Sequence, residues 1–266
     1  MKLMISADIE GTCGICSWDE TTGSHPEYAY FQAQMTKEVA GVCEAALESN
    51  RVKELLIKDA HDNARNLIPS MLPEEVEIIR GWEGVPGGMM SGIREDISAV
   101  AMTGYHSAAY TAGNPLAHTS NRQNQFVKLN GQIASEFLIN AYLAAYYKVP
   151  VILLSGDRAL CESAKELIPA IETVAVSEGC GTASKSVHPS KAVRLLKEGM
   201  KRALQKDPAQ CLIKLPEHFL AEIEFKELGK AQRGANYPGA VRTGTRSVSY
   251  EAADYYEIVR FFYFVL

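Results

Sequence analysis

The sequence predicts an α/β fold: a largely parallel sheet with helices on both faces, followed by a smaller C-terminal α+β domain. Two observations support the sheet. Short apolar runs alternate with longer segments whose apolar residues recur every three to four positions, the pattern of strands alternating with amphipathic helices. The run at 149–157 is apolar almost throughout, as expected for a parallel strand covered on both faces. This alternation is typical of a parallel α/β sheet.

Each expected element follows from one of these runs. Strands are expected at 2–9, 52–61, 75–81, 96–106, 125–130, 149–157 and 171–179. Helices are expected at 27–49, 132–148 and 158–169, and the glycine-rich stretch 85–95 is expected to form a loop with a short helix. From about residue 184 the pattern changes to a helix at 188–205 and two strand-containing segments, 211–226 and 245–266. We therefore predict an α/β domain over 1–190 and an α+β domain over 191–266.

Composition excludes two classes of partner. The 266 residues carry 27 basic and 32 acidic side chains, a net charge of −5, so we expect no nucleic acid partner. No basic amphipathic stretch or long apolar run is present, so we expect no membrane contact. The apolar run at the N-terminus is too short for a signal peptide, and the six cysteines are scattered rather than densely spaced. A cytoplasmic location is therefore expected.

Polar residues that suit a metal follow several of the predicted strands. In open α/β sheets, ligands bind beyond the carboxyl ends of the strands. Acidic and histidine side chains stand at these ends or in the loops that follow: Asp8, Glu10, Asp59, His61, His106 and His118. Glu136 lies in the first turns of a predicted helix, where a carboxylate is also favourable simply as a partner for the helix dipole.

Each of these residues alone is more often structural than functional, but together they indicate a metal site. Two histidines with one aspartate and two glutamates suit Zn²⁺, allow Mn²⁺ or Co²⁺, and suit Mg²⁺ poorly. Five such ligands are more than one tetrahedral zinc ion uses. The surplus suggests two metals that share a bridging carboxylate, as in two-metal hydrolases.

The chain also resembles a known family, the D-aminopeptidase family of di-zinc metallopeptidases found in dipeptide-transport operons. The resemblance rests on five motifs in order: SADIEG, KDAHDNARNL, TGYHSAA, LAHTSN and ASEFLINAYLAAYYKVPVILLSGD. It runs from residue 1 to about 195 and continues more weakly to the C-terminus. The resemblance implies a catalytic, metal-binding domain at 1–190 and ring-like homo-oligomers.

The resemblance also implies roles for six residues. Two zinc ions per chain would be bridged by Asp8, with Glu10 and His61 completing one site and His106 and Glu136 the other. His118 would be catalytic rather than a ligand. The expected reaction is hydrolysis of the N-terminal residue from a short peptide of D-amino acids by a metal-activated water, with His118 assisting proton transfer.

Several alternatives stay open at this stage. The alternatives to an aminopeptidase are another two-metal hydrolase (an amidase or a phosphoesterase) and a non-catalytic peptide-binding protein. The CxxC at Cys13 and Cys16, where the family normally lacks cysteine, is interpreted as incidental turn residues, with a redox pair and a metal site as the alternatives. Asp59 is a candidate to orient the His61 ring. Arg242 and Arg246 could bind a peptide carboxylate, although a solvated hairpin explains them better.

Overall fold

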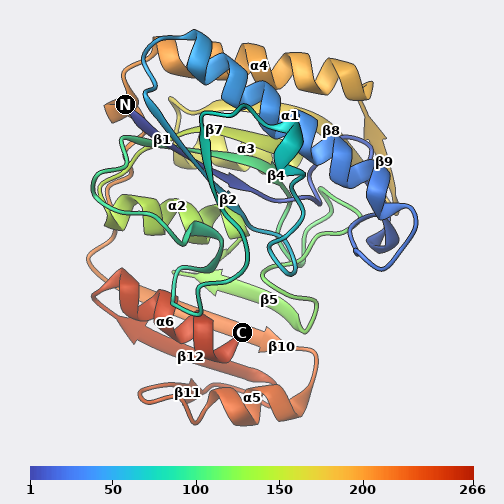
Figure 1. Ribbon diagram of the computed structural model, residues 1–266. Helices are drawn as coiled ribbons and strands as arrows, with labels where there is room; N and C mark the ends of the chain where they lie inside the picture. The colour runs from blue at the N-terminus through green and yellow to red at the C-terminus, as the bar shows by residue number, and fades with distance from the viewer.

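The computed structural model describes residues 1–266 and contains two sheets, one beside the other (Figure 1). The larger sheet has seven strands in the order β3-β2-β1-β4-β7-β8-β9, and all neighbours are parallel except β8 and β9. Its strands are β1 (Lys2–Ala7), β2 (Glu54–Asp59), β3 (Val76–Ile79), β4 (Ala99–Tyr105), β7 (Val151–Asp157), β8 (Glu172–Cys180) and β9 (Ala183–Ser186). The predicted parallel sheet is confirmed.

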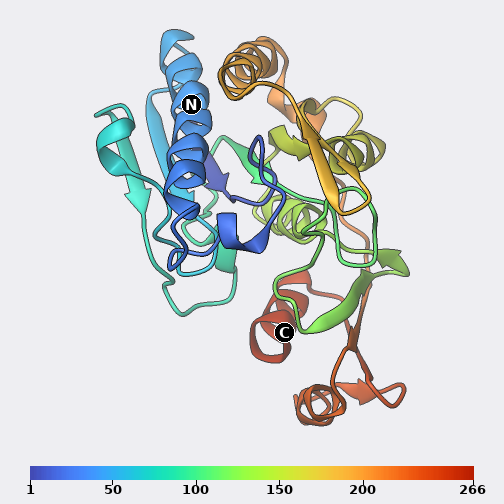
Figure 2. The same cartoon turned by 90° about the vertical axis from the view of Figure 1, so that its right-hand side faces the viewer.

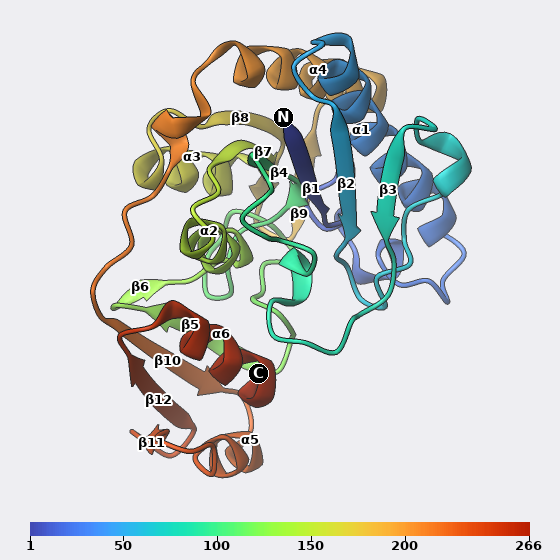
Figure 3. The same cartoon turned by 60° about the vertical axis from the view of Figure 1, so that its left-hand side comes forward.

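Helices cover both faces of this sheet. Helices α1 (Tyr28–Glu48) and α4 (Pro189–Gln205) lie side by side on one face, where α4 also contacts β7 and β8 (Figure 2). Helices α2 (Glu136–Tyr146) and α3 (Arg158–Leu167) lie on the other face (Figure 3). Every residue of β4 and β7 is buried between these two layers. The continuous apolar runs therefore follow from double coverage of the central strands.

Capping side chains fix where these helices begin. Ser135 accepts a hydrogen bond from Leu138 N at the start of α2, and Asp157 accepts one from Leu160 N at the start of α3. His188 caps α4, whose first residue is Pro189. The cap at Ser135 matters for function because it places Glu136 in the first turn of α2.

The second sheet is antiparallel, with the order β11-β12-β10-β5-β6. Its strands are β5 (Asn124–Leu129), β6 (Gln132–Ile133), β10 (Phe219–Phe225), β11 (Val241–Arg242) and β12 (Ser247–Ala252), with helices α5 (Leu228–Gly234) and α6 (Tyr255–Val265). Residues on both sides of position 190 therefore share this sheet, while α4 packs on the first one. The boundary at 190 stays a prediction.

The last residues of the chain form a helix that the sequence pattern did not distinguish from a strand. Asp254 caps α6 by accepting a hydrogen bond from Tyr256 N, and the apolar residues from Tyr255 onward then cover the second sheet and α2. Four 3₁₀ helices complete the structure: η1 (Trp18–Glu20), η2 (Pro69–Met71), η3 (Gly88–Met90) and η4 (Pro208–Cys211). None of the helices has the length and apolar character needed to cross a membrane.

Candidate metal centre

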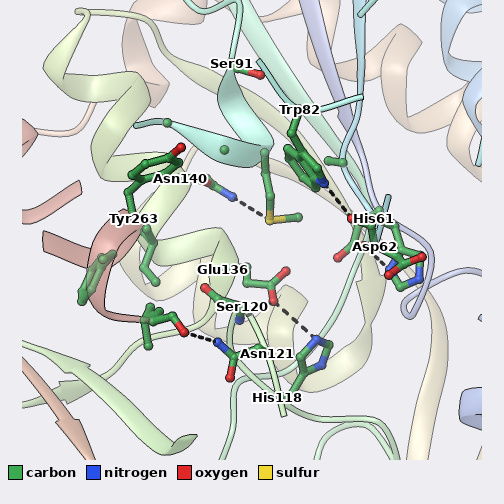
Figure 4. A pocket seen from close by; sticks show the side chains of 18 of the residues that line it. His61, Asp62, Trp82, Ser91, His118, Ser120, Asn121, Glu136, Asn140 and Tyr263 are labelled. Carbon is green, nitrogen blue, oxygen red and sulfur yellow. Dashed lines mark hydrogen bonds and ion pairs between the residues drawn. The ribbon is translucent and has the colours of Figure 1, made fainter. Parts of the chain in front are cut away.

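The predicted site residues meet in one pocket at the carboxyl ends of the parallel strands. Asp8 and Glu10 follow β1, His61 follows β2, and Glu136 opens α2; all four line a cavity of about 730 Å³ together with His118 (Figure 4). His106 follows β4 and is completely buried directly behind them. The expectation that ligands gather beyond the carboxyl ends of parallel strands therefore holds for residues up to 98 positions apart, Asp8 and His106.

Two glycines allow the ends of β1 and β4 to approach closely enough to form this site. The Gly11 N–H donates to the Gly104 carbonyl oxygen over 2.8 Å. A Cβ at Gly11 would collide with the Tyr105 carbonyl, and one at Gly104, where φ is +68°, would collide with the Asp8 carbonyl. The positions of Asp8 and His106 relative to each other are thus set by backbone contact.

Each of the three histidines is held by a backbone carbonyl. His61 Nε2 lies 2.9 Å from Thr21 O, His106 Nδ1 lies 2.9 Å from Ser107 O, and His118 Nδ1 lies 2.9 Å from Leu116 O. Such a contact places the ring proton on the nitrogen that faces the carbonyl, which leaves the other nitrogen free as a base or a metal ligand.

The free nitrogens all face carboxylates. His61 Nδ1 lies 3.0 Å from Glu10 Oε2 and 3.5 Å from Asp8 Oδ1. His106 Nε2 lies 3.6 Å from Asp8 Oδ2 and 3.5 Å from Glu136 Oε2. His118 Nε2 lies 3.7 Å from Glu136 Oε1 and 3.9 Å from Glu10 Oε1. These six side chains form one continuous cluster.

The cluster fits a pair of metal ions. Its ligand atoms form three groups in which all atoms lie within 4.8 Å of one another: Asp8–Glu10–His61, Asp8–His106–Glu136, and Glu10–His106–His118. The first two share Asp8. Three buried atoms that face the cluster, Asp8 Oδ2, Glu10 Oε2 and His106 Nε2, have no hydrogen-bond partner. Leaving them unpaired would be costly, whereas coordination would satisfy all three, and mixed imidazole and carboxylate donors suit zinc.

The protein groups perturb one another's ionisation strongly. Burial raises the pKa of Asp8 well above its usual value, and the Glu10 carboxylate adds to the rise. Burial also opposes ionisation of Glu10 and Glu136, but the His61 charge outweighs it and lowers the pKa of Glu10, and the His106 charge lowers the pKa of Glu136 to about 2. Burial disfavours a proton on His106, yet Glu136 raises its pKa to about 10.

His118 differs from the other two histidines. Burial lowers the pKa of His118, and the positive charge of His106 lowers it further, against the attraction of Glu136 and Glu10. The imidazole of His118 is therefore the one that stays neutral at physiological pH, with Nε2 able to accept a proton. This separates His118 from the rings of His61, whose pKa is raised well above its usual value, and of His106.

Neighbouring side chains hold the loops that carry the cluster. Asp59 does not touch the His61 ring; its carboxylate accepts hydrogen bonds from Asn66 N, Asn66 Nδ2 and Leu67 N and so shapes the loop after β2. Asn66 Nδ2 also donates to the His61 carbonyl. The suggested contact of Asp59 with the His61 ring is thus wrong, because Thr21 O occupies that place.

The two cysteines of the CxxC lie outside the metal groups. Cys13 is buried and its Sγ donates to Val187 O over 3.0 Å, while Cys16 is exposed beside Glu20. Both thiols are free, and burial raises the pKa of Cys13 to about 12, so that its reactive thiolate is scarce. These contacts support the interpretation of the pair as turn residues.

The walls of the pocket come largely from residues that sequence reasoning missed. Trp18 from η1, Trp82 from the loop after β3, Arg122 before β5 and Tyr263 from α6 all line it. Lys58 lies with its Nζ 4.4 Å from the centre of the Trp82 ring, and Trp82 Nε1 donates to Asp62 O. Single aromatic residues in irregular segments carry no periodic signal in the sequence, so only the three-dimensional structure shows that they line the pocket.

Comparisons with known proteins agree with this geometry. The sequence profile of a family described as D-aminopeptidase matches residues 1–264. A D-aminopeptidase of Bacillus subtilis (strain 168) is 32% identical over 259 residues, which cover 97% of this chain and 93% of the relative. The solved structure described as the Zn-dependent D-aminopeptidase DppA from Bacillus subtilis, a self-compartmentalizing protease, is 31% identical. It superposes with a TM-score of 0.91 over 98% of this chain and 95% of that one.

Proposed function

Because this chain belongs to the D-aminopeptidase family, we propose that it is a zinc-dependent aminopeptidase that releases the N-terminal residue of short D-amino-acid peptides. The observation that carries the proposal is the pair of three-residue ligand groups that share Asp8. Three unpartnered ligand atoms in this cluster support it. A peptide-binding protein without catalysis would need neither feature.

The ligand assignment is part of the proposal. Asp8 would be shared by two zinc ions, with Glu10 and His61 completing one site and His106 and Glu136 completing the other. The carbonyl contacts of His61 and His106 support it, because they point one free nitrogen of each ring at the shared carboxylate. When bound, two zinc ions would polarise the scissile carbonyl and acidify the attacking water.

His118 is the proposed proton carrier. Its neutral ring is held by Leu116 O through Nδ1, so Nε2 accepts a proton from the attacking water and then donates it to the leaving amine. The Glu10 and Glu136 carboxylates, 3.9 Å and 3.7 Å from Nε2, stabilise the imidazolium formed in between. Asp62 and Glu83, the acids of the pocket that are not proposed ligands, would favour an α-ammonium group, which accounts for attack at the first peptide bond.

Self-association and location complete the proposal. We expect a homo-oligomer, since the related Bacillus subtilis structure is described as self-compartmentalizing and this chain leaves large apolar side chains exposed, such as Tyr110 at 70% and Phe264 at 66%. Multi-angle light scattering would measure the assembly. All six cysteines are free, which suits the reducing cytoplasm that we propose as its location.

Metal content and activity together test the function. We expect about two zinc ions per chain by elemental mass spectrometry and hydrolysis of D-Ala-D-Ala that is lost on chelation and restored by zinc. L-Ala-L-Ala serves as the stereochemical control. A preparation that carries two zinc ions but cleaves neither dipeptide would contradict the proposed activity.

A further inference from the structure

Arg122 lies against Trp18 at the edge of the pocket. Its guanidinium carbon is 4.3 Å from the centre of the Trp18 ring, over the ring face. Both residues line the cavity that contains the metal centre, although Trp18 belongs to η1 and Arg122 to the segment that leads into β5. Two segments far apart in the sequence therefore hold a cation beside the site.

This guanidinium is unpaired. Other arginines such as Arg158, Arg202 and Arg260 form ion pairs with glutamates, whereas Arg122 forms none. Arg122 is also the only lysine or arginine that lines the pocket; the other charged lining residues, besides the histidines, are acids: Asp8, Glu10, Asp62, Glu83 and Glu136. Stacking on an aromatic face keeps the planar N–H donors of an arginine free for an anion in the same plane.

The position of Arg122 is fixed relative to the proposed chemistry. The Trp18 ring meets the His118 ring edge-on, with ring centroids 5.1 Å apart and an interplanar angle of 71°. Two successive contacts, of 5.1 Å and 4.3 Å, thus lead from His118 to Arg122. The His118 ring and the Arg122 guanidinium are therefore no farther apart than these two distances combined, which corresponds to at most about three residues of an extended peptide at about 3.3–3.6 Å per residue.

We propose that Arg122, held on Trp18, binds the C-terminal carboxylate of the substrate and so restricts the enzyme to dipeptides and tripeptides with a free carboxyl end. The inference rests on the proposed aminopeptidase function and adds to it the rule for substrate length. A short peptide carries an ammonium group at one end and a carboxylate at the other. The pocket offers two acids outside the proposed ligand set, Asp62 and Glu83, and one guanidinium, which matches both ends.

The test compares D-Ala-D-Ala with its C-terminal amide, which keeps the scissile bond and removes the negative charge. Wild-type enzyme is expected to cleave the free acid with a kcat/KM about 10- to 100-fold higher, the effect of a charge-assisted hydrogen bond. Arg122→Gln is expected to lose this preference, through a raised KM for the acid and little change in kcat or in cleavage of the amide. Arg122→Lys, which keeps the positive charge, should keep part of the preference for the free acid over the amide.

Arg242→Gln is the matched control. Arg242 lies in an exposed hairpin, bonded to the carbonyls of Gly244 and Thr245, so this variant should keep the wild-type preference. An equal loss for acid and amide in Arg122→Gln would overturn the inference, as would a wild type that cleaves both equally well. A wild type that cleaves neither would overturn the proposed function itself, and zinc content in every variant separates these outcomes from loss of metal.

Discussion

His106 and His118 stack face to face, with ring centroids 4.3 Å apart and ring planes within 5° of parallel. Each ring is anchored to a backbone carbonyl through Nδ1, and both Nε2 atoms face Glu136. The two imidazoles are nevertheless unequal: the His106 ring is completely buried and the His118 ring faces the pocket. This arrangement suits one ligand and one proton carrier.

Replacement of His118 separates these two roles. We expect His118→Ala to lower kcat by about 10²- to 10⁴-fold, the usual contribution of general acid–base catalysis, with zinc content unchanged. Steady-state kinetics and elemental analysis of the same preparation would measure both. His218→Ala is the control, because His218 is an exposed histidine that precedes β10 and lies outside the pocket. Loss of one zinc ion from His118→Ala would instead make His118 a ligand, in the group with Glu10 and His106.

The shared carboxylate is tested by Asp8→Asn. Because Asp8 belongs to both proposed ligand groups, its loss should affect both metals, and zinc content should fall from about two per chain to one or none. Asp62→Asn, which changes an exposed acid of the same pocket, should keep both. An unchanged zinc content in Asp8→Asn would contradict a bridging role for this residue.

Metal affinity should rise with pH. Among the protein groups alone, His106 has a pKa of about 10 because Glu136 favours its charged form, so at pH 7 a metal ion must displace that proton. The apparent affinity should therefore increase up to about pH 10, by about tenfold per pH unit for each displaced proton. Competition with a chelator between pH 6 and pH 9 would measure the slope. A flat profile would show that His106 is already neutral before metal binds.

A buried acid beneath the site makes stability depend on pH. Glu38 in α1 is completely buried; burial raises its pKa from 4.5 to about 7, although Gln34 and the Cys13 N–H partly favour the carboxylate. The folded state then binds this proton more tightly than the unfolded chain. Its contribution is complete below pH 4.5 and is lost as pH rises through about 7.

Glu38→Gln removes the titrating group and with it the loss of stability at high pH. The variant should be more stable than wild type at pH 8, by up to roughly 3 kcal/mol, and the difference should shrink toward pH 4.5. Urea unfolding at pH 5 and pH 8 measures it. Glu75→Gln, an exposed acid without an ion pair, is the control. A difference that does not change with pH would mean that Glu38 does not titrate in this range.

The contact between the ends of β1 and β4 should not tolerate a side chain. Gly104→Ala is expected to cost more than about 2 kcal/mol, because the residue has φ +68° and its Cβ would collide with the Asp8 carbonyl. Gly131→Ala is the matched control: φ is +79° there, but no atom lies within 4 Å, so only the backbone cost of about 1 kcal/mol applies. Thermal unfolding would compare the two. Equal losses would show that the close approach is not rigid.

The metal cluster was predictable because strand order in a parallel sheet converts distant sequence positions into neighbours. Asp8, His61 and His106 each follow a strand, and these strands are adjacent in the order β2-β1-β4. Glu136 was counted among the candidate ligands, but a glutamate in the first turn of a helix has an equally good structural explanation, so its place in a particular metal site rested on the resemblance to a family. Residue type and strand order were therefore enough to predict most of the metal-site residues.

The walls of the pocket were not predictable in this way. Trp18 and Arg122 meet because η1 and the segment before β5 fold over the same strand ends, a path that no local pattern encodes. Arg242 and Arg246, the arginines first considered for a carboxylate, lie in and beside an exposed hairpin away from the pocket lining. Helix α6 was also unforeseen, since a short aromatic run fits a strand or a helix equally well.

The metal cluster and the walls of the pocket come from different segments of the chain, and this affects how substrate specificity can change within the family. Asp8 and His106 follow strands β1 and β4, whose ends are held together by backbone contact, whereas Trp18, Trp82 and Tyr263 project from a 3₁₀ helix, a loop and the last helix. Even the link from η1 to His61 uses the Thr21 carbonyl rather than a side chain. Peptide specificity can therefore change during evolution through substitutions in these three surface segments, while the residues of the metal site and their chemistry stay the same.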